Sequence, residues 1–253
     1  MAGDIITNSI GMKLAWIPPG KFIMGSPKND PDRQDNEMQH TVELTKGFYM
    51  GVYPVTQEEY AKVMPLGPCC FCSTGGMRHK VAGMDTKRFP VEHVTWHEAF
   101  EFCRRLGGME AKNYDLPTEA EWEYACRAGT STAFKFDEEL SSRQANFGNN
   151  LGRTSAVGSY PANAFGLFDM HGNVSEWCKD CFDSDFYSKS PKTNPECTSG
   201  GARVLRGGSW NYGAALCRES FRGLSRPQLA RRPRLQYRFS CGVVLPRVRL
   251  TAR

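Results

Sequence analysis

The sequence predicts a single α+β domain with few helices, short strands and much irregular chain. Short apolar stretches bounded by turn residues occupy the first 53 residues, and helix-start signals follow further along. Long segments with neither a helical nor a strand period separate these elements. A length of 253 residues suits one large domain. We therefore expect residues 1–253 to form one unit.

The first predicted elements are strands. Residues 10–26 contain two apolar stretches on either side of Pro18-Pro19-Gly20, which is a turn signal. Residues 40–44 alternate as a half-buried strand, and residues 48–53 follow as another. The polar, charged residues 27–39 between them are expected to form a surface loop.

Three helices are predicted from one shared signal. Each begins with a threonine followed three residues later by a glutamate, a capping box in which side chains satisfy backbone donors at the helix start. The pairs are Thr56 with Glu59, Thr95 with Glu98, and Thr118 with Glu121. The second helix is expected to end at Gly107-Gly108. Its predicted apolar stripe consists of Trp96, Ala99, Phe100, Cys103 and Leu106.

The ten cysteines are too few for a disulfide scaffold in a chain of this length. Two CxxC pairs, Cys69/Cys72 and Cys178/Cys181, lie about a hundred residues apart, which is not zinc-ribbon spacing. Cys126 falls on an apolar helix face, where a thiol packs as a small hydrophobic group. Cysteine usage leaves the redox compartment open.

Composition is that of a water-soluble globule. Mean hydropathy is −0.50, and no apolar run approaches the roughly 20 residues of a membrane helix. The N-terminus lacks the basic and apolar regions of a signal peptide. We therefore expect no membrane span and no export address within this sequence.

Charge is distributed unevenly along the chain. Residues 203–253 hold twelve arginines, no lysine and one acid, Glu219, a net charge of +11. The whole chain carries +5, so residues 1–202 carry −6. Arginine without lysine favours bidentate hydrogen bonding and stacking over phosphate neutralisation. Together with the spread of these arginines, this argues against a nucleic-acid partner.

Several motifs resemble the formylglycine-generating-enzyme (sulfatase-modifying factor) superfamily, in the same order and over nearly the whole chain. They are Met24-Gly25-Ser26, Pro54-Val55-Thr56-Gln57, Pro90-Val91 through Val94-Thr95-Trp96, residues 116–125 (LPTEAEWEYA), Arg127-Ala128-Gly129, residues 172–177 (GNVSEW) and residues 203–210 (RVLRGGSW). The resemblance implies a modified C-type lectin fold. Because one fold hosts several activities, it does not by itself identify the function.

The enzymatic branch of the superfamily implies two copper(I)-binding cysteines after the glycine corner. Soft thiolates suit copper(I). By position the second falls on Cys217, whereas the first falls on Tyr212, which cannot supply a thiolate. The iron-dependent branch implies clustered histidines, which this sequence lacks. We therefore expect no catalytic residues, with a formylglycine-type oxygen-dependent enzyme as the alternative.

A second branch, the variable proteins of diversity-generating retroelements, resembles the C-terminal region more closely. Those proteins display a mutated segment on a fixed frame, and asparagines after the Gly-Gly-Ser-Trp motif become other residues. Here the frame matches Asn211, Cys217-Arg218, Arg222, Pro227 and Gly242. Between these, the candidate ligand-binding residues are Tyr212, Gly213, Leu216, Glu219, Phe221, Leu224, Gln228, Leu229, Gln236 and Tyr237. Val243-Val244 departs from the pattern and puts the register of the last strand in doubt.

The resemblance implies a ligand-binding protein whose variable segment, residues 211–240, contacts an unidentified macromolecule. Tyrosine and arginine suit such surfaces. Trp177, Trp210 and Arg206 are expected to hold the backbone beneath it. The alternative is that residues 211–240 form an ordinary exposed loop without a binding role. Display on this pattern implies a location at the cell exterior.

No cofactor is expected to be required, although calcium-binding members of the superfamily suggest one candidate site. By resemblance, Asn173 and Glu176 are its possible side-chain ligands, since calcium takes hard oxygens. Their alternative role is turn-making and an internal hydrogen bond. A second calcium site of the superfamily uses an asparagine matching Asn146 and a later aspartate, which is absent before Val157.

Overall fold

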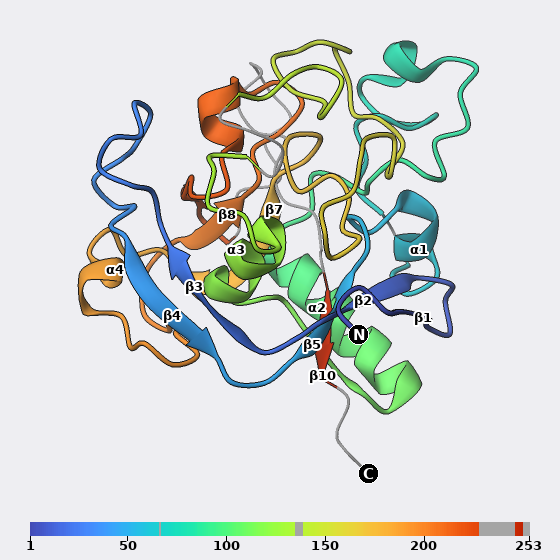
Figure 1. Cartoon of the computed structure of the whole chain (residues 1–253). Helices are drawn as coiled ribbons and strands as arrows, with labels where there is room; N and C mark the ends of the chain where they lie inside the picture. The colour runs from blue at the N-terminus through green and yellow to red at the C-terminus, as the bar shows by residue number, and fades with distance from the viewer. Residues whose placement is uncertain (66, 135–138, 228–245, 250–253) are drawn as a thin grey trace.

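The protein is described from a computed structural model, which places residues 1–65, 67–134, 139–227 and 246–249 (Figure 1). The strands are β1 (Ile5–Thr7), β2 (Lys13–Ile17), β3 (Gly20–Met24), β4 (His40–Leu44), β5 (Phe48–Gly51), β6 (Asn113–Asp115), β7 (Glu176–Cys181), β8 (Arg203–Arg206), β9 (Gly223–Ser225) and β10 (Arg247–Arg249). The α-helices are α1 (Gln57–Ala61), α2 (Trp96–Glu110), α3 (Glu119–Arg127) and α4 (Phe186–Lys189). The 3-10 turns are η1 (Arg78–Val81) and η2 (Ala214–Cys217). The predicted α+β class is confirmed.

Three small antiparallel sheets form the scaffold. The largest has the order β1-β2-β5-β10-β6, so β10 near the C-terminus pairs with β5 and β6. The second is the β3-β4 pair, and the third has the order β7-β8-β9. The two strands flanking Pro18-Pro19-Gly20 are present, but β2 and β3 belong to different sheets, so the turn links sheets and closes no hairpin.

All three predicted capping boxes are present. In each, the threonine side chain accepts from the backbone N–H of the glutamate, whose carboxylate accepts from the threonine backbone N–H. The helix α3 lies near the middle of Figure 1, where β3, β7 and β8 contact it. Its Trp122 and Ala125 are fully buried. This helix is therefore the central element on which the C-terminal region packs.

Two details of α2 differ from expectation. The helix continues through Gly107 and Gly108 to Glu110 and ends at Ala111, which has a left-handed conformation. Gly107 allows close approach instead, because a Cβ there would meet the Lys112 carbonyl oxygen at 2.7 Å. The buried stripe includes Phe102, whereas the predicted Phe100 is 38% exposed.

The long segment between α1 and α2 contains a Cys69–Cys72 disulfide, which links residues three positions apart. Cys178 and Cys181, the other CxxC pair, are buried free thiols. Among the described residues, no helix combines the length and hydropathy needed to cross a bilayer.

Candidate functional site

The described part of the predicted variable segment, residues 211–227, follows a glycine corner at the end of β8. Gly207 and Gly208 have φ values of 83° and 70°, which strongly favour glycine. A Cβ on Gly208 would meet the Cys217 sulfur at 2.5 Å. The corner therefore brings η2 back against the end of β8, and the chain continues from η2 to β9, which pairs with β8.

The inner side of this segment is held by buried arginines. Arg222 makes a bidentate contact with the Glu119 carboxylate of α3, at 2.8 and 2.9 Å. Arg206 of β8 reaches the same carboxylate at 2.9 Å and Glu123 at 2.6 Å. It also donates to the Glu219 backbone carbonyl. All of these side chains are buried, so each charge depends on its partner.

Electrostatics in this network follow from its geometry. Burial raises the pKa of the Glu119 carboxyl, but the Arg222 and Arg206 guanidinium groups outweigh it and hold the pKa below its usual value. Glu123 behaves in the same way beside Arg127 and Arg206. Both carboxylates therefore stay ionised inside the protein.

Another buried arginine, Arg218, connects the segment to residues 27–39. Arg218 makes a bidentate contact with Glu37, at 2.9 and 3.0 Å, and contacts Asp30 at 2.9 Å. Glu37 also accepts from the Ser26 hydroxyl at 2.7 Å. Part of residues 27–39, expected only as a surface loop, is thus fixed against the C-terminal region. The sequence analysis did not predict the Arg218–Glu37 pair, although the acidic charge of residues 1–202 and the basic charge of residues 203–253 indicated that such pairs could form.

The structure corrects one predicted binding residue. Glu219 is fully buried, and its carboxylate accepts from Arg127 at 2.9 Å and from the Thr130 hydroxyl at 3.3 Å. Burial raises the pKa of this carboxyl to about 7, with Arg127 opposing the shift. A side chain in this position belongs to the frame and does not face a ligand, so its assignment to the binding surface is wrong.

The other described candidates lie on the outer side of the segment. Tyr212, Leu216 and Phe221 are partly exposed, and Gly213 is exposed. Leu224 is 49% exposed. Gln228, Leu229, Gln236 and Tyr237 lie outside the described residues, as do Gly242 and Val243-Val244.

Cys217 and Arg218 are buried, as the frame pattern requires. Trp177 and Trp210 are buried as well, and Trp210 makes an edge contact with Phe71 at 5.4 Å between ring centroids. Burial raises the pKa of the Cys217 thiol to about 12. Thus the expected supports of the backbone are confirmed to be interior.

The two candidate calcium ligands make internal contacts. The Asn173 amide oxygen accepts from the Ser155 backbone N–H at 3.0 Å, and the residue has a φ of 56°. Glu176 accepts from the Trp122 indole at 2.5 Å, and burial raises its pKa to about 8. Its other oxygen has no hydrogen-bond partner among the described groups. These side chains fill the turn-making and hydrogen-bonding roles. A calcium ion at this place would need backbone carbonyls as further ligands, because calcium takes six to eight oxygens.

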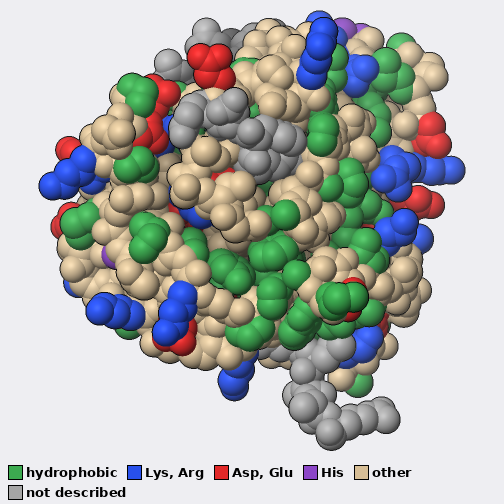
Figure 2. All heavy atoms as spheres, in the orientation of Figure 1, with side chains coloured by type: hydrophobic (Ala, Val, Ile, Leu, Met, Phe, Trp, Pro, Cys, Tyr) green, Lys and Arg blue, Asp and Glu red, His purple; other side chains and the backbone are tan. Residues whose placement is uncertain are grey.

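Surface charge gives no support for a nucleic-acid interface on the face shown in Figure 2. There the lysine and arginine side chains are scattered, and hydrophobic side chains gather in the lower half of the view. The buried arginines of the C-terminal region explain part of this, because Arg206, Arg218 and Arg222 are used inside the protein.

Residues 8–233 match the sulfatase-modifying factor enzyme 1-like domain. Among curated proteins, the serine/threonine-protein kinase pkn1 of Chlamydia caviae is 33% identical over 218 residues, covering 78% of this chain and 33% of the relative. The formylglycine-generating enzyme of Streptomyces coelicolor is 36% identical over 162 residues, covering 58% of this chain and 48% of the relative. The chain thus spans about a third to a half of the length of these relatives.

Two solved structures are similar over almost the whole chain. PvdO from Pseudomonas aeruginosa has a TM-score of 0.83 at 26% identity, covering 99% of both chains. Treponema denticola variable protein 1 has a TM-score of 0.79 at 25% identity, covering 98% of this chain and 99% of that one. The fold predicted from the motifs, with few helices, scattered short strands and much irregular structure, is confirmed.

Proposed function

Because this chain belongs to the sulfatase-modifying factor enzyme 1-like domain family, whose members share a fold but not one activity, we propose that it is a non-enzymatic ligand-binding protein. Its binding surface is the outer side of residues 211–240, in the manner of a diversity-generating retroelement variable protein. The ligand is a protein or other macromolecule.

The observation that carries this proposal is the division of residues 211–227 into two sides. Cys217, Arg218 and Arg222 are fixed in the interior by packing and ion pairs. Gly213 and Leu224, on the outer side, are exposed and carry no charge. Side chains of the second kind can change without removing a buried charge partner, which is what a diversified surface needs.

The similarity to Treponema denticola variable protein 1 along 98% of this chain supports the same proposal. Display of such a surface implies that the protein works at the cell exterior. The proposal also implies alleles that differ mainly at the outer positions, beside a nearly identical repeat in the genome.

The alternative is a formylglycine-type oxygen-dependent enzyme, favoured by the similarity to the Streptomyces coelicolor formylglycine-generating enzyme and by the retained Cys217. Its weakness is Tyr212 at the position of the first copper cysteine, because a phenol does not replace a thiolate for copper(I). A copper(I) titration of the wild type and of Cys217→Ser separates the two. Tight binding that is lost in the variant supports the enzyme.

The direct test is selection of binders. The codons for Tyr212, Gly213, Leu216, Phe221 and Leu224 are randomised in the displayed full chain, which is then selected against two unrelated purified proteins. We expect specific binders to each, with melting temperatures within about 3 °C of the parent, since surface changes cost little. Failure to recover any binder from a folded library would refute the proposed function.

A further inference from the structure

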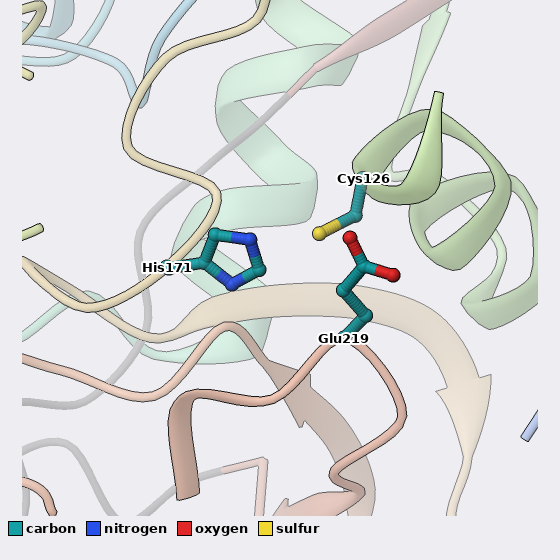
Figure 3. Close-up of side chains that lie close together, drawn as sticks. All are labelled: Cys126, His171 and Glu219. Atoms are coloured by element: carbon teal, nitrogen blue, oxygen red, sulfur yellow. The ribbon is translucent and has the colours of Figure 1, made fainter. Parts of the chain in front are cut away.

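A buried cluster of three side chains lies beneath the start of the variable segment. Cys126 comes from the end of α3, His171 from the loop before β7, and Glu219 from the chain after η2 (Figure 3). One ligand-type atom from each lies within 4.8 Å of the others. The three residues are 0%, 2% and 0% exposed, respectively. Three distant parts of the sequence thus place sulfur, nitrogen and oxygen at one point.

The histidine is oriented as a metal ligand would be. Its Nδ1 lies 2.8 Å from the Cys217 backbone carbonyl, and a carbonyl oxygen only accepts, so Nδ1 carries a hydrogen. In the neutral ring, Nε2 then bears the lone pair. Figure 3 shows a ring nitrogen directed toward the Cys126 sulfur and the Glu219 carboxylate. A backbone carbonyl on the opposite nitrogen is the usual support for a metal-binding histidine.

The Glu219 carboxylate already has a partner of opposite charge, because Arg127 contacts it at 2.9 Å. A divalent ion would stabilise the thiolate form of Cys126, since a coordinating cysteine is deprotonated by the metal it binds. A neutral imidazole adds no charge. Arg127 occupies one Glu219 oxygen at 2.9 Å, whereas the other accepts the longer 3.3 Å bond from Thr130, and that oxygen is the one a metal would take.

The ligand types select the class of metal. Thiolate and imidazole suit zinc and its neighbours, and exclude calcium and magnesium, which take oxygens. Zinc bonds of about 2.0 to 2.3 Å put tetrahedral ligand atoms roughly 3.5 Å apart. The three side chains would therefore close by about 1 Å around the ion.

We propose that Cys126, His171 and Glu219 form a three-ligand zinc-class site, with the fourth tetrahedral position left to a non-protein ligand such as water, and that it ties α3, the loop before β7 and the variable segment together. The site lies on the inner side of that segment, so it does not depend on what the outer side binds. It gives the frame a fixed point directly behind Cys217, whose carbonyl holds His171.

Cobalt(II), a spectroscopic substitute for zinc, tests the site. The full chain carries Cys69→Ser and Cys72→Ser, which removes the disulfide cysteines as competing ligands, and is purified under reducing conditions and stripped of metal. We expect one equivalent of cobalt to give visible tetrahedral bands and a near-ultraviolet thiolate band. Cys126→Ala should abolish the thiolate band and weaken binding by roughly a hundredfold. The control Cys103→Ala removes another buried free thiol and should change neither.

His171→Gln and Glu219→Gln provide independent readings if Cys126→Ala does not fold, as judged by near-ultraviolet circular dichroism. Each should weaken cobalt binding at least tenfold while the thiolate band persists at saturation. The proposal is overturned by absence of a thiolate band in the parent protein. It is equally overturned by binding that survives Cys126→Ala but is lost on replacing Cys178 and Cys181.

Discussion

The inner and outer sides of residues 211–227 come from the same short stretch but differ in the burial and charge of their side chains. On the inner side, Arg218 and Arg222 each make a bidentate contact with a buried carboxylate. On the outer side, Tyr212 and Leu224 are exposed in part and carry no charge. From this difference we expect the burial of each side chain to decide whether a position in this segment tolerates substitution.

The inner side also explains the uneven charge of the chain. The acids that neutralise Arg206, Arg218 and Arg222 come from residues 30–123, which belong to the acidic body. These three arginines of the basic end therefore form ion pairs within the protein and are not available to an outside partner. Guanidinium suits this role because its planar fork matches a carboxylate in two places.

The largest effect is expected from Arg206→Met, which leaves Glu119 and Glu123 short of a buried partner. Breaking a buried pair from one side costs about 3 to 5 kcal/mol. Urea unfolding measures the loss. The control Arg226→Met removes an exposed arginine of the same segment and should change stability by less than about 0.5 kcal/mol. An equal loss of unfolding free energy in the two variants would contradict the proposed difference between buried and exposed side chains.

Arg218→Met should cost about 2 to 4 kcal/mol, because Glu37 keeps a hydrogen bond from Ser26 and Asp30 lies nearer the surface. It should also release residues 27–39 from the C-terminal region. Limited proteolysis followed by mass spectrometry detects new cleavage in that loop. Unchanged cleavage would show that Arg218 does not hold the loop.

Asp180 beside the inner network predicts a pH dependence of stability. Burial, and then the Glu119 charge, raise its pKa to about 8, although the Cys197 and Glu119 backbone N–H groups oppose the shift. In the unfolded chain an aspartate has a pKa of about 3.9. The folded state therefore binds the proton more tightly, and stability falls as pH rises from about 4 to 8.

The variant Asp180→Asn cannot titrate, so its free energy of unfolding should fall by about 1 to 3 kcal/mol less than that of the wild type between pH 5 and pH 8. Urea unfolding at several pH values gives the two slopes. Parallel slopes would mean that Asp180 is ionised in the folded protein. The comparison uses the change of stability with pH and not the absolute stability, because the amide also perturbs the hydrogen bonds from the Glu119 and Cys197 backbone N–H groups.

Calcium is expected to have the smallest effect. The Asn173 amide oxygen and one Glu176 oxygen already accept hydrogen bonds from Ser155 and Trp122, and burial raises the pKa of Glu176 to about 8, so a chelator should shift the melting temperature by less than about 2 °C. Differential scanning calorimetry with calcium or chelator makes the measurement. A stabilisation that grows with calcium concentration would instead assign these residues to a calcium site.

The elements that could be predicted from sequence are those with local causes. The capping boxes at Thr56, Thr95 and Thr118 need only residues three positions apart, and all three are present. The end of α2 could not be predicted in the same way. Gly107 looks like a stop signal, but a Cβ there would meet the Lys112 carbonyl oxygen, so the glycine allows close packing.

In the candidate site, too, features with local causes could be predicted and features that depend on distant residues could not. The motif pattern separated frame from surface correctly for Cys217, Arg218 and Arg222. It failed for Glu219, because the partner that holds it inside, Arg127, is 92 residues away. The cluster of Cys126, His171 and Glu219 could not be predicted for the same reason, because its residues lie far apart in the sequence and no local pattern links them.

The central claim is best tested by saturation mutagenesis of residues 211–227, with protease resistance of the displayed full chain as the measure of folding. We expect nearly all substitutions to be tolerated at Gly213 and Leu224, and most at Tyr212. At Arg218, Glu219 and Arg222 few or none should be tolerated. Equal tolerance along the whole stretch, or intolerance concentrated at the outer positions, would contradict the account.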